Sequence, residues 1–251
     1  MNPEAIKDLL YRLADDKLIM GHRHSEWIGI GPILEEDIAF ASMAQDEVGH
    51  AQAYYMLLHE LGEAEPDTLA FQRSAAQFRC CHLVEYPIGD YAFSLVRHYL
   101  FDTADQVRLA HLVDASYQPL AQLARKLARE EKYHQLHART FMQQLGRAGG
   151  EARARLQTAL DEAYPLALGL FEPTVHTDTL ARTGVQPHED KLMKTWRVAT
   201  GEFLQGCGLH APTPGDPVEY FGGRSGYHTP HLEALLAEMT EVFAIDPQAR
   251  W

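Results

Sequence analysis

Residues 120–145, LAQLARKLAREEKYHQLHARTFMQQL, point to the fold class. Their apolar residues recur every three or four positions, which is the period of one face of an α-helix. That face consists of Leu120, Leu123, Leu127, Ala138, Phe141 and Leu145. Glu131 and His134 fall on the same face and interrupt it. The stretch therefore predicts a long helix that turns a carboxylate and an imidazole toward the protein core.

A second Glu-x-x-His motif, Glu47 to His50, lies in another helical pattern at residues 33–61. Its apolar neighbours on the same face are Phe40, Met43, Tyr54 and Leu58. Because the chain has 14 histidines and many glutamates, chance can produce such pairs, so their placement on apolar faces carries the argument. An ionised carboxylate that faces a core costs several kcal/mol unless it is paired, protonated or bound to metal. The two motifs need a common explanation.

Ferritin-like four-helix bundles supply that explanation. Two helices each contribute Glu-x-x-His to a pair of metal ions, and the other two helices each add one carboxylate. Oxygen and imidazole ligands suit iron or manganese. The sequence therefore predicts an all-α, ferritin-like four-helix bundle with additional C-terminal helices and a di-iron centre, with manganese as the alternative metal.

The bundle needs two more carboxylates, and hairpin geometry indicates where to look for them. In two antiparallel helices, the residue level with a motif glutamate lies about as many positions before the turn as the glutamate lies after it. A turn at residues 116–117 places Asp102 level with Glu131, and Asp102 shares an inner face with Leu95, His98, Leu109 and Val113. A turn at residues 29–32 points instead to Asp15 or Asp16 as the partner of Glu47. Glu26 is level with Glu47 only if the connection runs back in extended form. From the pattern alone, all three residues remain candidates.

Helical patterns dominate the whole chain, and one domain is expected over residues 1–251. The bundle core should span about residues 3–146, followed by C-terminal helices and a loop at 147–251. The predicted helices run from 3 past 20, 33–61, 88–115, 119–145, 151–171, 187–204 and 231–243, with one short run in 67–79. Gly62 is a candidate left-handed cap and Gly146 a helix stop. Residues 206–227 form a loop rich in glycine and proline.

Composition limits the function classes. The chain has 251 residues, 46% apolar and 23% charged, with a net charge of −13, so binding nucleic acid or anionic lipid through bulk charge is not expected. No stretch approaches the roughly 20 apolar residues that span a bilayer, and the charged N-terminus does not resemble an export signal, so the cytoplasm is expected. Cys80, Cys81 and Cys207 are too few and too badly spaced for a disulfide framework or a thiolate metal site.

Four segments resemble the metal-ligand segments of catalytic A subunits in the bacterial family of ring 1,2-phenylacetyl-CoA epoxidases. They are HSEWIG (24–29), AQDEVGHA (44–51), YLFD (99–102) and REEKYH (129–134). The resemblance implies the ligand set Glu26, Glu47, His50, Asp102, Glu131 and His134. It therefore favours Glu26 over Asp15 and Asp16 in the first hairpin.

Over nearly its whole length the sequence is more similar to the C subunits of the same family. The similarity rests on RLADD (12–16), SEW (25–27), LEEDIAFA (34–41), DTLAF (67–71) with the following QF, YHTPHLEALLAEM (227–239) and the ending Gln248 to Trp251. C subunits are usually described as structural partners whose metal site has decayed. Here Glu47, His50 and Glu131 stand where typical C subunits carry non-ligands, so an intact di-iron site is expected.

The resemblance implies a subunit of a multicomponent di-iron monooxygenase that uses O2 to epoxidise the ring of phenylacetyl-CoA in aerobic phenylacetate catabolism. Expected partners are an A-type paralogous subunit, other epoxidase components, an acyl-CoA substrate and further chains of a homo- or hetero-oligomer, but neither nucleic acid nor membrane. Electrons would come from a separate NADPH-dependent reductase. No catalytic residue beyond the metal ligands is expected. The alternatives are a non-catalytic structural subunit that pairs with an A-type subunit, or an independent ferritin-like di-iron oxidase.

Overall fold

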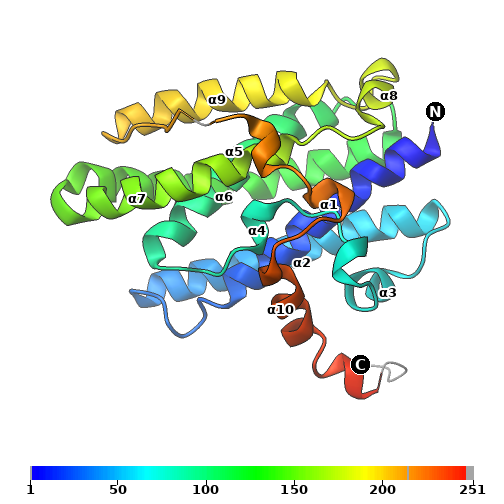
Figure 1. The fold of residues 1–251 in the computed structure, drawn as a ribbon, viewed down its shortest axis with the longest axis horizontal. Helices are drawn as coiled ribbons and strands as arrows, with labels where there is room; N and C mark the ends of the chain where they lie inside the picture. The colour runs from blue at the N-terminus through cyan, green and yellow to red at the C-terminus, as the bar shows by residue number, and fades with distance from the viewer. Residues whose placement is uncertain (1, 214, 247–251) are drawn as a thin grey trace.

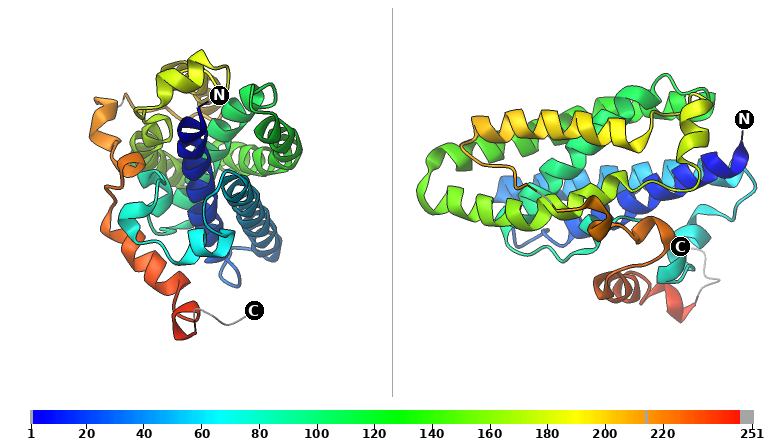
Figure 2. Two further views of the ribbon diagram at one scale, coloured as in Figure 1. Left: turned by 90° about the vertical axis from the view of Figure 1, so that its right-hand side faces the viewer. Right: turned by 45° about the horizontal axis from the view of Figure 1, so that its top comes forward.

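Four long helices form the core of the fold. The computed structural model describes residues 2–213 and 215–246, so the resemblance at Gln248 to Trp251 lies outside the described residues. The four helices are α1 (Pro3–Ser25), α2 (Leu34–Glu60), α5 (Tyr91–Leu112) and α6 (Gln118–Ala148). α1 packs along α2, α5 packs along α6, and α2 also contacts α6 (Figures 1 and 2). The predicted all-α, ferritin-like class is confirmed.

Further helices cover this bundle on one side. α7 (Gly150–Ala167) and α9 (Glu189–Gly206) both pack on α5, and the chain then crosses to the face that carries α4 (His82–Glu85). The shorter elements are α3 (Pro66–Phe71), η1 (Ala75–Gln77), η2 (Leu168–Phe171), α8 (Thr177–Arg182), η3 (Pro217–Tyr220), η4 (Gly223–Ser225), α10 (Pro230–Met239) and η5 (Phe243–Ile245). The predicted helical run at 67–79 is thus two short pieces, α3 and η1.

Local sequence signals explain where the long helices begin and end. Asn2 caps α1, because its side-chain oxygen accepts hydrogen bonds from the backbone N–H groups of Glu4 and Ala5. Asp90 caps α5 in the same way by accepting from the N–H of Phe93. After α2, Gly62 takes a φ of +92°, which confirms the predicted left-handed position.

Gly146 does not stop α6 as predicted. The helix runs on to Ala148 and is followed by Gly149, whose φ is +72°. Gly146 serves close packing instead, because a Cβ there would lie 2.5 Å from the carbonyl oxygen of Cys207. In the sequence, a glycine that is required for close packing looks the same as a glycine that ends a helix.

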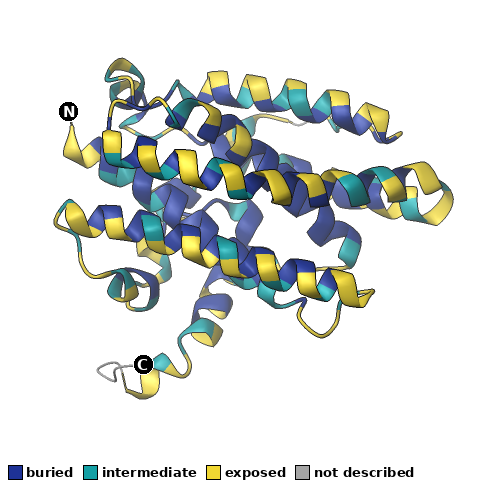
Figure 3. Ribbon diagram, turned by 180° about the vertical axis from the view of Figure 1, so that it is seen from behind, coloured by how far each residue is buried: buried dark blue, intermediate teal, exposed yellow. Residues whose placement is uncertain are grey.

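The inner faces of the long helices are buried and their outer faces are exposed (Figure 3). One large apolar cluster runs through the bundle and into α7 and α9. A smaller one, formed by Trp27, Ala39, Phe40 and Met43, lies near the start of α2. Within the described residues, no helix is both long enough and apolar enough to cross a membrane. The functional question therefore concerns the polar groups inside the bundle.

Candidate metal centre

Four ligand-type side chains converge in the middle of the bundle. Glu47 comes from α2, Asp102 from α5, and Glu131 and His134 from α6, and one donor atom of each lies within 4.8 Å of the others. All four are 0–2% exposed. The reflection of Glu131 through the second turn thus found the position of Asp102. This is a donor set of three carboxylates and one imidazole, which suits iron or manganese.

Both histidines of the Glu-x-x-His motifs turn one ring nitrogen inward and the other to an acidic partner. His134 Nδ1 lies 3.5 Å from Glu47 Oε1, while its Nε2 is 3.2 Å from Asp46 Oδ2. His50 Nδ1 lies 3.6 Å from Glu131 Oε1, while its Nε2 is 2.7 Å from Glu130 Oε2. Metal-binding histidines commonly have such a carboxylate partner, which fixes the tautomer and the ring orientation. The arrangement leaves Nδ1 of both rings facing the cluster.

Helix α1 contributes a lysine to this cluster rather than a carboxylate. Lys17 Nζ lies 2.9 Å from Glu47 Oε2, 2.5 Å from Glu131 Oε1 and 2.7 Å from Asp105 Oδ2. The lysine is 2% exposed, so its ammonium is a buried cation among three carboxyl groups. It contacts the carboxylates that a metal ion at this place would also use.

The electrostatics of the cluster follow from these contacts. Burial disfavours the charged ammonium, but Asp105, Glu131 and Glu47 outweigh burial and raise the pKa of Lys17 well above its ordinary value. Burial also opposes ionisation of Glu131, yet Lys17 and a hydrogen bond from His50 lower the pKa of that carboxyl. Burial raises the pKa of Asp105 to about 7.

Three further groups of the cluster have shifted pKa values. Burial opposes ionisation of Glu47, but Lys17 and a hydrogen bond from His134 lower the pKa of that carboxyl. Burial, reinforced by Glu131, raises the pKa of Asp102 well above its ordinary value, which favours the protonated form of that carboxyl. Burial alone would lower the pKa of His134, but its hydrogen bond with Glu47 and the charge of Glu131 raise it to about 10. Lys17 and protonated His134 thus offset Glu47 and Glu131, and the cluster is close to neutral without a metal.

The donor set fits a metal ion in two respects. Among the described residues, no hydrogen bond reaches Asp102 Oδ1 or Glu131 Oε2, although each atom is buried. Buried polar atoms are rarely left without a partner, and such atoms are free to coordinate an ion. The histidines also already have the outer partners of a metal ligand. A metal at this position would have to displace or neutralise Lys17.

The structure does not bring the three α1 candidates into the cluster. Glu26 Oε1 is 2.6 Å from Arg23 Nη1, and the Glu26 side chain is 29% exposed. Asp15 pairs with Arg73. Asp16 pairs with Arg224. The ligand role of Glu26 stays a prediction that this arrangement does not support.

The geometry of the first hairpin explains the position of Glu26. Gly21 is level with Glu47, because a Cβ on Gly21 would lie 3.2 Å from Glu47 Cβ and from the Ala44 carbonyl oxygen. Residues 26–33 form turns and bends, and Glu26 itself has helical backbone angles, so the connection does not run back in the extended form that the Glu26 alternative required. Glu26 is still five residues beyond Gly21, or about 7 Å along the helix axis.

Sequence reasoning missed Lys17 and Asp105, although a signal for each was present. Lys17 falls on the same heptad-spaced face as Leu10, Leu13, Met20 and His24. Asp105 shares the inner face of α5 with Asp102. Both interrupt an apolar stripe, as the Glu-x-x-His motifs do. The apolar part of a lysine side chain can cover apolar surface while its ammonium reaches water. A lysine on an apolar face therefore predicts a buried charge less strongly than a carboxylate does.

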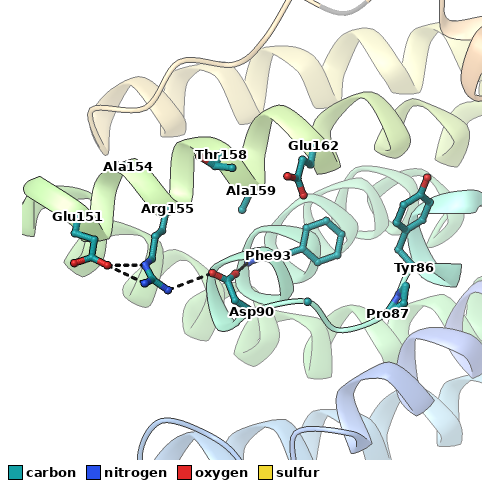
Figure 4. A pocket seen from close by; sticks show the side chains of 11 residues that line it. Tyr86, Pro87, Asp90, Phe93, Glu151, Ala154, Arg155, Thr158, Ala159 and Glu162 are labelled. Carbon is teal, nitrogen blue, oxygen red and sulfur yellow. Dashed lines mark hydrogen bonds and ion pairs between the residues drawn. The ribbon is translucent and has the colours of Figure 1, made fainter.

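Space around the cluster is limited. A cavity of about 20 Å³ adjoins Lys17 and Asp105, and it is also lined by Phe101. That volume holds about one water molecule. A much larger cleft of about 510 Å³ opens between the start of α5 and α7, lined by Phe93, Arg155 and other residues (Figure 4). None of its lining residues belongs to the metal cluster.

Two comparisons with known proteins agree with each other. The profile of the family described as phenylacetic acid catabolic protein matches residues 1–251. The C subunit of the 1,2-phenylacetyl-CoA epoxidase from Escherichia coli (strain K12) is 30% identical to this chain over 241 residues, which cover 96% of each chain.

Proposed function

Because this chain belongs to the phenylacetic acid catabolic protein family, we propose that it is a subunit of the multicomponent epoxidase that acts on phenylacetyl-CoA in phenylacetate catabolism. The observation that carries this proposal is the similarity to an epoxidase C subunit over 96% of both chains. Its partners would be an A-type paralogous subunit and a separate NADPH-dependent reductase. Action in the cytoplasm stays a prediction.

We further propose that the bundle centre binds iron. Glu47, Asp102, Glu131 and His134 would hold the metal, and His50 would complete the family's paired site beside Glu131. Bound iron would supply the activation of O2. The chain's own contribution would be to orient these donors through Asp46 and Glu130 and to keep the centre dry. Glu26 would join the site only if the end of α1 moved.

Anaerobic loading with ferrous iron tests this metal site. We expect one to two irons per chain by elemental analysis, lost together in a Glu131→Gln variant. Asp161→Asn is a matched control, because Asp161 is an exposed residue of α7 outside the cluster. A folded sample with no iron above background would leave the second candidate, a structural subunit that retains ligand-type residues without using them. The three contacts of Lys17 with carboxyl groups are the observation that favours this candidate.

Reconstitution with an A-type subunit and a reductase separates the two candidates. The variant needs four changes, Lys17→Met, Glu47→Leu, His50→Gln and Glu131→Ala. Lys17 is included because removing only the acids would leave a buried ammonium with fewer counter-charges, which is costly. If the complex assembles and epoxidation is undiminished, this chain is structural. If epoxidation falls in proportion to the iron lost from this chain, its centre takes part in turnover.

Exposed apolar residues around the α1–α2 connection offer a surface for a partner protein. They are Ile28, Ile30, Ile33, Leu34 and Ile38, each at least 50% exposed. A groove of about 500 Å³ next to them is lined by apolar atoms of Ile28, Ala41, Ala44 and Val48. Contiguous exposed apolar surface commonly marks a protein contact. We assign this surface to the A-type subunit, because the relative that matches the whole chain is named as one subunit of an epoxidase.

A further inference from the structure

A second group of ligand-type residues lies outside the bundle centre, between α4 and the C-terminal segment. Cys80, Glu85 and His228 each offer one donor atom, and these atoms lie within 4.8 Å of one another. Cys80 and Glu85 are 0% exposed. The His228 side chain is 4% exposed. None of these three residues belongs to the cluster in the bundle centre.

Close backbone packing fixes the position of His228 in this group. A Cβ on Gly223 would lie 2.1 Å from the Cys80 carbonyl oxygen, so only glycine permits this approach. Gly226 has a φ of +83°, and a Cβ there would lie 2.3 Å from the carbonyl oxygen of Ala76. The chain around Gly223 and Gly226 therefore lies directly against residues 76–81, and this packing also positions His228, two residues further on.

The outer contacts of the group leave its three donor atoms facing one another. His228 Nε2 is 3.1 Å from the Phe78 carbonyl oxygen, so Nε2 carries a hydrogen and donates it there. Glu85 Oε2 accepts hydrogen bonds of 2.7 Å from both the N–H and the O–H of Thr229. What remains is His228 Nδ1, Glu85 Oε1 and the sulfur of Cys80. Ligands of bound metals are commonly held by outer partners of this kind.

A hydrogen or a metal cation must lie between two of these atoms. His228 Nδ1 is 2.7 Å from Glu85 Oε1, and two lone pairs at that distance repel each other. Either the imidazole and the carboxyl group share a proton there, or a metal cation takes its place. Cys80 Sγ, 3.9 Å from Glu85 Oε1 and 4.0 Å from His228 Nδ1, is the third donor that a metal would use and a proton would not.

We propose that Cys80, Glu85 and His228 bind one divalent transition-metal ion of the zinc class, which fastens the C-terminal segment to α4. In a tetrahedral zinc site, sulfur lies about 3.6 Å from nitrogen and oxygen, and nitrogen about 3.3 Å from oxygen. The three donor distances differ from these values by about 0.6 Å or less. A mixed thiolate, imidazole and carboxylate set suits zinc rather than magnesium or calcium.

Binding exchanges protons for the metal with no change in local charge. Without metal, the neutral thiol of Cys80 lies beside the imidazole of His228 and the carboxyl group of Glu85, which share one proton. With metal, the thiol and the imidazole–carboxyl pair each release one proton, and the divalent cation offsets the thiolate and the carboxylate. Burial and the charge of Glu85 raise the pKa of the Cys80 thiol, so the thiolate forms only with the cation. The sequence argued against a thiolate site because cysteine spacing alone cannot show that Cys80 meets a histidine 148 residues away.

Cobalt(II) tests this site in the full-length chain, because a cobalt–thiolate bond absorbs in the near ultraviolet and the bundle centre has no sulfur ligand. The protein is produced in cobalt-supplemented medium, so that the buried site fills during folding. We expect a charge-transfer band that corresponds to one cobalt per chain and disappears when zinc replaces it. Cys80→Ser should abolish the band, whereas Cys81→Ser and Cys207→Ser should retain it, because Cys81 and Cys207 are buried cysteines outside this donor group.

A gentler variant covers the case in which Cys80→Ser does not fold. Thr229→Val removes only the hydroxyl that orients Glu85, and should weaken cobalt binding by about 10-fold to 100-fold. A folded wild-type protein with no such band, whatever its cobalt content, would overturn the proposal and leave the hydrogen bond between His228 and Glu85 as the link between the two segments. Neither result bears on whether the chain joins the epoxidase, since the bundle residues are unchanged.

Discussion

Replacing Lys17 by methionine tests whether this lysine acts as the internal cation of the bundle centre. Methionine keeps an unbranched side chain of similar length and removes the charge. The carboxyl groups of Glu47, Glu131 and Asp105 would then lie within the bundle without the ammonium that is now 2.5–2.9 Å from one oxygen of each. Removing one partner of a buried ion pair typically costs about 3–5 kcal/mol. We expect the metal-free variant to lose stability in that range at pH 8.

The pH dependence of this loss has a defined sign. Without Lys17, the folded-state pKa values of Glu47 and Glu131 rise from below their ordinary value to above it, and that of Asp105, which is already raised, rises further, because burial is no longer opposed by the ammonium. The penalty is then largest above those raised pKa values and shrinks as the pH falls and the groups take up protons. Urea unfolding of chelator-treated protein at pH 8 and pH 5.5 measures both effects. Lys7→Met is the matched control, since Lys7 lies on the same helix and contacts Glu63 at the surface.

Metal binding should change in the opposite direction. Because Lys17 and a metal would use the same carboxylate oxygens, Lys17→Met should bind ferrous or manganous ion more tightly than the wild type and regain stability when loaded. Titration of both proteins under anaerobic conditions gives the comparison. Unchanged stability at pH 8, or metal binding at least tenfold weaker in the variant, would refute the assignment of Lys17 as a competing cation.

Four further outcomes follow from particular contacts. Asp46→Asn should weaken metal binding about 10-fold to 100-fold in an iron titration, because Asp46 orients His134 from outside the cluster. Glu26→Ala should leave iron content unchanged by elemental analysis, since its carboxylate pairs with Arg23; lost iron would restore the ligand set implied by the family. Ile38→Asp should weaken association with an A-type subunit in size-exclusion chromatography without changing iron content. Glu189→Gln should destabilise the fold by about 3 kcal/mol at pH 7. Burial disfavours the Glu189 carboxylate, but Arg108 and Arg12 lower its pKa to about 2, so denaturant curves of wild type and variant should converge as the pH falls from about 4.5 toward 2.

The sequence predicted the second hairpin well because its connection is short. α5 ends at Leu112 and α6 begins at Gln118, so reflecting Glu131 through that turn reached Asp102. The first connection spans residues 26–33 without helix, and no periodic pattern reports how far such a segment runs back. The three candidates in the first hairpin therefore stayed open from the pattern alone. Asp15 and Asp16 pair with arginines far away in the sequence, and Glu26 pairs with the nearby Arg23.

Other parts of the molecule gave no periodic signal. Gly146 is glycine because Cys207 packs against it, and that contact lies 61 positions away in the chain. The group at Cys80, Glu85 and His228 forms only because the C-terminal segment crosses α4. Helical periodicity reports which face of one helix is buried, whereas these features depend on which segments meet.

Helix α1 shows why the bundle can fold with or without metal. Its inner charges each have their own counter-charge: Asp15 has Arg73, Asp16 has Arg224, and Arg12 has Glu189. Lys17 completes the series, with the metal-ligand carboxylates as its partners. A metal ion would therefore enter a cluster that is already close to neutral. Its affinity would be set by the difference between coordination and the contacts of Lys17 that it displaces. Iron loading of the wild-type protein shows whether the metal binds, and the Lys17→Met comparison measures how much of the affinity the contacts of Lys17 remove.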